Sequence, residues 1–415
     1  MAWCLEDLVE EKSRILEPNS DSITNILTLR YDPSITPIFP KKTWKDISLQ
    51  NFSTADFFEK LIEKNISQII EYHKAKKISI ALSGGVDSTL VLAMIRKMFP
   101  DIEIDALSIK FADSIDETKK ASEIAEKFEA NHHVLYVENY LQNLPEAISI
   151  IKLPFWDLHW FYVVNKAKTL SKILASGDGG DELFGGYTFR YQKFLSLVNS
   201  GSSPLEKVQA YLLCHERDRV PDQESLFSTN AKFSWDRIHE ILLPYFDNPL
   251  SPLEQVFLAD YNGKLLYNFS PVNSRILENF EMKSLSPLLS NDLISSALKI
   301  PKEQKYDEST NVGKLVLRKL LSKFDINSII TNEKLGFNVD PMKLWKAHGH
   351  QICSEYLNNS RIVNESWVRA DWIERYIDRN DLDVRYINKF YGLLAFEIWY
   401  RIFVTREMSA NTTLN

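Results

Sequence analysis

Two short glycine-rich segments carry the residue types in this chain that could bind a nucleotide. Residues 83–88 have the sequence SGGVDS, and residues 176–187 have the sequence SGDGGDELFGGY. Together they hold seven of the 13 glycines in the chain. Glycine lets the backbone turn tightly and approach a ligand closely, and the N–H groups of such turns bind anionic oxygens. We therefore expect a phosphate-binding site built from both segments.

The first segment combines phosphate donors with one carboxylate. The N–H groups of Gly84 and Gly85, with the start of a following helix, would cradle phosphate oxygens. Asp87 would repel phosphate unless Mg²⁺ lies between them. A plain turn is the alternative for an isolated glycine pair, but the full motif after an apolar strand favours nucleotide binding. The neighbouring hydroxyl donors are Ser83, Ser88 and Thr89.

The second segment places three carboxylates, Asp178, Asp181 and Glu182, close together. Such a group must be offset by a metal ion or another cation. A shared Mg²⁺ opposite Asp87 is the simplest arrangement.

Alternating strand and helix patterns surround the two segments. Strands are predicted at 78–82, 104–109, 133–137 and 172–175, and helices at 54–72, 89–98, 115–129 and 140–151. This order predicts an α/β fold with a parallel sheet flanked by helices. The glycine-rich segments would then follow strand ends, where ligands bind in open parallel sheets. The apolar run at 26–29, before a proline-dotted connector, predicts one or two further strands.

Length and composition divide the chain into three expected regions. Its 415 residues suggest two or three domains, or one large domain with an appendage. We expect an N-terminal extension over 1–55, a nucleotide-binding core over 56–195, and a mainly helical region over 196–415 that completes the substrate site.

Composition excludes several classes of protein. The net charge of −7 provides no overall field for nucleic acid. No apolar run approaches the roughly 20 residues of a membrane span, and the N-terminus resembles no secretion signal. Three isolated cysteines, Cys4, Cys214 and Cys353, suggest neither disulfides nor a zinc site. A cytoplasmic protein is expected.

Both motifs resemble known families. SGGVDS resembles the pyrophosphate loop of the ATP-pyrophosphatase (PP-loop) superfamily, and SGDGGDELFGGY closely resembles the signature of the asparagine synthetase synthetase domain. The resemblance covers roughly residues 60–350. It implies an enzyme that uses ATP and Mg²⁺, adenylates a carboxylate with release of pyrophosphate, and joins the acyl group to ammonia or an amine.

The resemblance also implies roles for individual residues. Asp87 and Asp181 match Mg²⁺ ligands, and Asp178 matches a candidate general base near the reacting centre. Either Asp178 or Glu182 would help deprotonate the amine. Lys334, in the Lys-x-Gly-Phe motif before Pro341 and Trp345, matches a lysine near the pyrophosphate. Lys314 and Arg318 match a Lys-x-x-x-Arg pattern at the start of a helix in the family, and this match is weaker. Positions that match AMP contacts are Leu82, Ser108, Ser176 and Gly177.

The sequence also departs from the family. Position 2 is Ala and the first motif begins by residue 83, so we expect no glutaminase domain before it. The enzyme would take free ammonia, receive ammonia from a separate glutaminase subunit, or use another amine as the nucleophile. A homodimer also stays open. Cys4 is expected to pack rather than react.

The segment between the third strand and the second motif also differs. Residues 153–162 contain no Arg or Lys, and five of the ten are aromatic. Such residues are more often core than pocket, but their position beside the acyl site favours a larger or less polar acid than aspartate. Arg275 and Lys283 remain candidates for substrate contact. His132 and His133 are expected to be structural, because neighbours on a strand face opposite ways.

Several functions stay open. Within the ligases, asparagine formation competes with amidation of another acid or with intramolecular cyclisation, as in β-lactam synthetases and lasso-peptide cyclases. A PP-loop enzyme that modifies tRNA is disfavoured by the acidic charge and the isolated cysteines. A non-catalytic subunit is disfavoured by the intact Asp87, Asp181 and Lys334.

Overall fold

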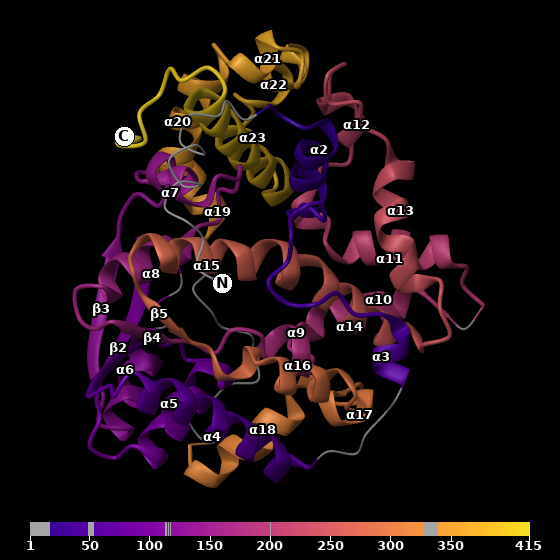
Figure 1. The fold of residues 1–415 in the computed structure, drawn as a ribbon. Coiled ribbons are helices and arrows are strands. Elements are labelled where there is room, and N and C mark those ends of the chain that lie inside the picture. The colour runs from indigo at the N-terminus through magenta and orange to yellow at the C-terminus, as the bar shows by residue number, and fades with distance from the viewer. Residues whose placement is uncertain are drawn as a thin grey trace.

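The structure is a computed structural model that describes residues 17–48, 54–112, 114, 116, 118–199, 201–326 and 339–415. Its centre is a five-stranded parallel sheet with the strand order β3-β2-β1-β4-β5 (Figure 1). The predicted fold class, a parallel sheet flanked by helices, is confirmed. The strands are β1 (Lys77–Ala81), β2 (Glu103–Phe111), β3 (Asn131–Val137), β4 (Ile173–Ala175) and β5 (Lys283–Leu285).

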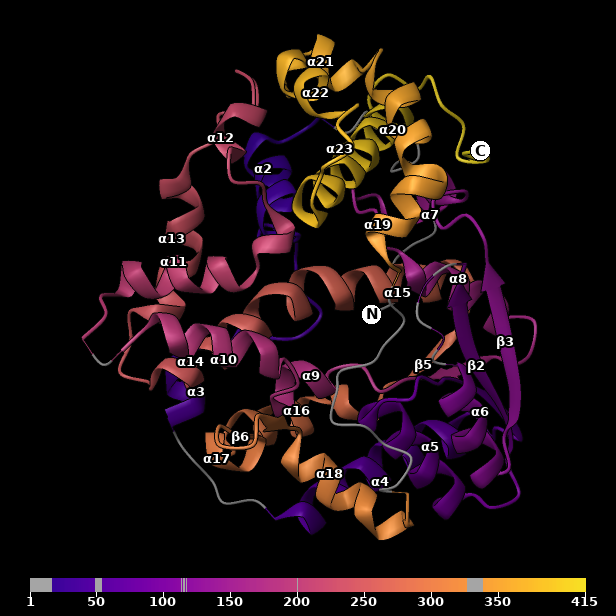
Figure 2. The same cartoon turned by 180° about the vertical axis from the view of Figure 1, so that it is seen from behind.

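Helices cover both faces of the sheet because alternate strand residues point to opposite sides. Ile104 and Ala106 of β2 join one hydrophobic core, and Leu107 and Ile109 join the other. Figures 1 and 2 show the helices on each side. The first core is covered by α4 (Ala55–Tyr72), α5 (Val86–Met98), α6 (Thr118–Lys127) and α18 (Leu315–Leu321). The second is covered by α7 (Leu144–Ile151), α8 (His159–Ala167), α15 (Ser270–Asn279) and α23 (Val384–Phe403).

The predicted strands and helices of the core all form, with ends that differ by a few residues. Helix α4 shows why the hydrophobic spacing in the sequence predicts these elements well. The Thr54 side chain accepts a hydrogen bond from the Phe57 N–H and caps the helix. Phe58, Ile62, Ile66 and Ile70 are buried at helical spacing. Strand β5 comes from residues 283–285, in the region where the sequence indicated mainly helices.

The strand predicted at residues 26–29 is wrong. These residues end a helix, α2 (Ser20–Leu29), which is capped by Asn19 and buried at every position from 23 to 29. The apolar residues Ile26, Leu27 and Leu29 form one short run, and periodicity cannot assign a run of this length to a helix or a strand. Tertiary contacts also favour the helix, since Lys389 of α23 and Gln223 both donate to the Leu27 carbonyl.

The remaining elements are mostly helical (Figure 2). None of the described helices is long and apolar enough to cross a membrane. These remaining elements are α3 (Trp44–Ser48), α9 (Gly180–Phe184), α10 (Thr188–Leu197), α11 (Pro204–Cys214), η1 (Glu216–Asp218), α12 (Gln223–Leu226), α13 (Trp235–Phe246), α14 (Pro252–Asp260), η2 (Tyr261–Phe269), η3 (Pro287–Leu289), α16 (Asn291–Leu298), α17 (Lys302–Lys305), the hairpin β6 (Tyr306–Asp307) and β7 (Val312–Gly313), η4 (Ser322–Phe324), α19 (Pro341–Leu344), η5 (Trp345–Gly349), α20 (His350–Leu357), α21 (Arg361–Asn364) and α22 (Ala370–Tyr376).

The two glycine-rich segments meet where the order of the strands reverses. After β1 the chain adds β2 and β3 on one side, and β4 and β5 then extend the sheet on the other side of β1. Crevices form at such switch points. The loops after β1 and β4 touch so closely that a Cβ on Gly177 would lie 2.6 Å from the Ser88 nitrogen. Only glycine fits there without a backbone shift.

We expect Gly177→Ala to destabilise the protein by about 1–3 kcal/mol, because the added methyl group would overpack the junction between the loops. Urea-induced unfolding measures this change. Gly201→Ala is the matched control, since a Cβ on Gly201 would meet only the Asn199 side chain at 3.3 Å. Equal stabilities of the two variants would contradict close packing of the loops.

Candidate active site

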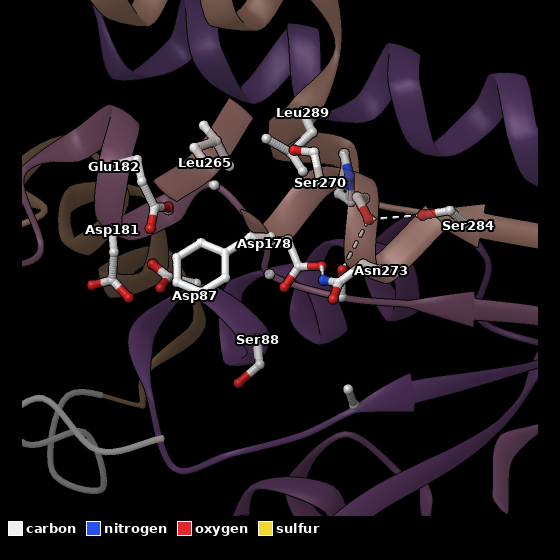
Figure 3. A pocket seen from close by; sticks show the side chains of 18 of the residues that line it. Asp87, Ser88, Asp178, Asp181, Glu182, Leu265, Ser270, Asn273, Ser284 and Leu289 are labelled. Carbon is white, nitrogen blue, oxygen red and sulfur yellow. Dashed lines mark hydrogen bonds between the residues drawn. The ribbon is translucent and has the colours of Figure 1, made fainter. Parts of the chain in front are cut away.

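A cavity of about 580 Å³ lies over the carboxyl ends of β1, β4 and β5. Its walls come from the two glycine-rich loops, from α15 and from the segment that follows β5. Figure 3 shows Asp87, Asp178, Asp181 and Glu182 around this pocket, with Asn273 beside Asp178. Ile38 and Phe39, from the expected N-terminal extension, also line it. The volume is in the range of pockets that bind small-molecule ligands.

The structure brings most of the predicted site residues to the pocket, but not all of them. Ser108 instead donates to the Leu82 carbonyl at 2.7 Å beneath the loop, and Thr89 donates to the Gly85 carbonyl at 2.7 Å. Gly84, Leu82, Ser108 and Thr89 do not line the cavity. Lys334 lies outside the described residues, as does Cys4. The predicted site residues that do line the cavity are Ser83, Gly85, Asp87, Ser88, Ser176, Gly177, Asp178, Asp181 and Glu182.

The first loop presents a helix N-terminus to the pocket. Gly85 is the N-cap of the 13-residue helix α5, and no side chain caps it. The hydroxyls of Ser83 and Ser88 lie 3.1 Å apart, and the Gly85 N–H donates to Ser83 Oγ at 3.2 Å. Uncapped N–H groups and the positive end of the helix dipole make this a suitable site for an anion.

Asp87 and Asp181 converge on one cation. Lys314 Nζ lies 2.5 Å from Asp87 Oδ2 and 2.8 Å from Asp181 Oδ1, and the three side chains are only 12–20% exposed. Burial alone would lower the pKa of Lys314, but the two carboxylates outweigh it and raise the pKa well above its usual value. The sequence contained only a weak sign of this residue, the Lys-x-x-x-Arg spacing with Arg318.

The same pair of carboxylates suits Mg²⁺. Mg²⁺ prefers oxygen ligands and is usually held by one or two carboxylates with substrate phosphates and water. Within the described ranges, no group of three or more His, Cys, Asp or Glu side chains is arranged to hold a metal ion. The two convergent carboxylates, beside a helix end that suits an anion, have the oxygen-ligand chemistry that Mg²⁺ prefers.

Asp178 and Glu182 differ in their surroundings. Burial raises the pKa of Asp178, while hydrogen bonds from Ser176 and Asn273 and the charge of His159 act in the opposite direction. The Asn273 amide donates to Asp178 Oδ2 at 3.1 Å. Glu182 is buried and accepts a hydrogen bond from the Tyr187 hydroxyl. Asp178 is thus the better placed of the two to take a proton from a ligand.

The second loop continues into a wall formed by η2, α15 and the segment that follows β5. Hydroxyls form a short chain there, with Ser176 Oγ and Ser284 Oγ each 2.9 Å from Ser286 Oγ. Arg275 and Lys283 do not line the pocket: the Arg275 guanidinium donates to the Ile151 carbonyl, and Lys283 is exposed on β5. The apolar part of this wall is formed by Leu265, Phe269, Leu277, Leu285, Pro287 and Leu289.

The aromatic segment serves both as core and as pocket wall. Phe155, Trp156 and Phe161 are buried in the second core. Trp160 is also buried, yet it lines the pocket together with Asp157 and His159. The two neighbouring histidines of β3 bond to different residues of β2: His132 to Ser108 at 2.9 Å and His133 to Asp105 at 2.8 Å.

Comparisons with known proteins give the family. The sequence profile of asparagine synthase matches residues 70–401, so this chain belongs to the asparagine synthase family. The expected resemblance is thereby confirmed. Asparagine synthetase [glutamine-hydrolyzing] 1 of Bacillus subtilis is 24% identical over 94% of this chain and 66% of its own length. Asparagine synthetase [glutamine-hydrolyzing] of Gallus gallus is 24% identical over 78% of this chain and 56% of its own.

The chain thus spans between about half and two thirds of the length of these curated relatives. Among solved structures, a U34-tRNA thiolase from Methanococcus maripaludis with its [4Fe-4S] cluster aligns with 58% of this chain and 83% of its own, at 15% identity and a TM-score of 0.25.

We expect Lys314→Met to destabilise the protein by about 3–5 kcal/mol without Mg²⁺, because it leaves two mostly buried carboxylates without their shared ammonium. Urea unfolding with and without Mg²⁺ tests this, and Mg²⁺ should restore part of the loss. The control is Lys64→Met, which removes an exposed ion pair with Asp292 and should cost less than about 1 kcal/mol. A Lys314→Met variant that Mg²⁺ does not stabilise would contradict a shared cation site.

Proposed function

We propose that this protein is an ATP-dependent amide ligase that forms AMP and pyrophosphate. A substrate carboxylate attacks the α-phosphate of ATP and gives an acyl-adenylate, and ammonia or an amine then displaces AMP. The observation that carries this proposal is the meeting of both motifs at one switch point, where the α5 N-terminus and the Asp87–Asp181 pair face the same pocket. Membership of the asparagine synthase family supports it.

The first half-reaction needs positive partial charge around the phosphates. The Ser83 and Ser88 hydroxyls and the start of α5 would hold the leaving pyrophosphate. Lys334 would approach the negative charge of the same pyrophosphate. Mg²⁺ held by Asp87 and Asp181 would neutralise phosphate oxygens when bound. Ser176 and Gly177 would contact AMP, with Leu82 and Ser108 supporting that wall from beneath the loop.

The second half-reaction needs a base, because ammonia and most amines are largely protonated at neutral pH. Asp178 can attract the ammonium and help remove its proton, since burial raises its pKa toward that of a useful acceptor. Glu182 would supply further negative charge behind it.

The charges of the pocket favour an acid other than aspartate. Among the described lining residues, Lys314 is the one Lys or Arg, and it faces Asp87 and Asp181. A second substrate carboxylate would meet Asp178 and the apolar wall rather than a fixed cation. This favours amidation of an acid whose body is uncharged, with intramolecular cyclisation of an amino acid derivative as the second candidate. The nitrogen source, including a separate glutaminase subunit, and any homodimer are also proposals.

Acid-dependent ATP–pyrophosphate exchange tests the proposal directly. A panel of L-aspartate, hexanoate, phenylacetate and N-acyl amino acids should include at least one acid that supports exchange, and an uncharged body should outperform aspartate. Asp181→Asn should lower that exchange by about 10²–10³-fold, since it removes charge that orders the phosphates. Asp292→Asn, at an exposed surface pair, is the control.

A folded protein that binds Mg-ATP but exchanges with no acid in the panel would contradict the proposed function. Full exchange activity in Asp181→Asn would contradict the role of the carboxylate pair.

A further inference from the structure

The connector between α2 and α3, residues 31–43, supplies part of the pocket wall. It belongs to the N-terminal extension, outside the nucleotide-binding core. Ile38 and Phe39, near its middle, line the same cavity as Asp178. Ile38 is 52% exposed, so a large apolar side chain of the pocket wall is open to solvent. Pockets bind organic ligands mainly through apolar contacts of this kind, with a few polar groups that orient the ligand.

The connector is held to η2 on both sides of these two residues. Before Ile38, the Asn268 amide donates to the Arg30 carbonyl at 2.6 Å. After it, the Asn262 side chain accepts from the Lys42 N–H and donates to the Lys42 carbonyl, both at 2.9 Å. Three prolines between these anchors restrict the backbone further. Ile38 and Phe39 therefore have a defined place over the pocket.

Helix η2 also joins the connector to the part of the pocket around Asp178. It contributes Leu265 and Phe269 to the lining and runs directly into α15. Helix α15 carries Asn273, whose amide donates to Asp178 Oδ2 at 3.1 Å. Figure 3 shows Leu265, Asn273 and Asp178 at the pocket. One continuous wall thus leads from the apolar connector to the carboxylate that we expect near the acyl carbon.

Helix α4 adds uncharged side chains to the lining. Ile69 and Phe39 line the cavity and are each partly buried against the first core. The polar residues of α4 at the cavity are Asn65 and Gln68, and the Asn65 amide already donates to the Pro287 carbonyl at 2.7 Å. A hydrocarbon group placed here would gain by leaving water, whereas a charged group would lose hydration without gaining a counter-ion.

We propose that Ile38 and Phe39 are specificity-determining residues that bind the apolar body of the acid substrate. This inference rests on the proposed ligase function and names its substrate class. The substrate is a monocarboxylic acid whose hydrocarbon body is long enough to reach from the neighbourhood of Asp178 to Ile38. The N-terminal extension thereby selects the acid, while the two glycine-rich loops bind the nucleotide.

A series of straight-chain acids tests this assignment through ATP–pyrophosphate exchange. From butanoate through hexanoate and octanoate to decanoate, kcat/KM for the acid should rise about three- to fourfold for each added methylene group until the chain covers Ile38. Ile38→Asp should lower kcat/KM by a factor that grows with chain length and reaches about tenfold. This loss should appear in the KM of the acid and leave the KM of ATP unaltered.

Ile38→Arg tests the same contact by a gain of function. Its guanidinium would supply the counter-ion that this wall lacks, so suberate should be used better than octanoate, the reverse of the wild-type preference. A variant that has merely lost structure would not reverse this order. The matched control is Val134→Asp, because Val134 is 50% exposed on β3 and does not line the pocket. Its exchange activity should equal that of the wild type.

Exchange that is independent of chain length, or a preference of the wild type for aspartate, would overturn the apolar substrate class and leave the ligase function intact. Equal losses for all acids in Ile38→Asp, or no loss for any of them, would overturn the role of Ile38. A folded wild-type protein that exchanges with no acid would overturn both proposals.

Discussion

The convergence of Asp87 and Asp181 on Lys314 is the interaction on which the arrangement of the site depends. The two aspartates follow different strands, and the lysine precedes α18, far along the chain. Two carboxylates this close repel each other unless a cation lies between them. The ammonium therefore ties the loops after β1 and β4 to the region that packs against α5, and the phosphate-binding face stays assembled before any nucleotide arrives.

The pocket divides into two electrostatic environments because of where these ion pairs lie. Near α5, helix N–H groups, Lys314 and the two carboxylates suit phosphate and a divalent cation. Toward α15, hydroxyls and aliphatic side chains surround Asp178, and Asp157 receives its counter-charge from Arg30 behind the wall. A substrate that spans both parts would place its phosphate ester in the first and its acyl body in the second. That division is the physical basis for proposing adenylation of an acid with an uncharged body.

Much of the core could be predicted because its signals are local. Helix α4 combines a threonine cap with apolar residues at helical spacing, and β1 is an apolar run that ends in a glycine turn. The apolar run of α2 is too short for periodicity to distinguish a helix from a strand. Lys389 and Gln223 stabilise the end of this helix from distant positions. Thr89 and Ser108 were expected at the ligand, but each satisfies a backbone carbonyl of the fold instead.

The two motifs, the α/β order of the core and the resemblance to the family could all be recognised in the sequence, because glycine turns, caps and hydrophobic periods act over a few residues. Tertiary structure alone decided which carboxylates meet, that Lys314 lies between them, and that Asp157 and His159 emerge from an aromatic segment at the pocket wall. Such pairings join residues up to 227 positions apart. Their distances are set by the strand order and by helix packing, which no local pattern encodes.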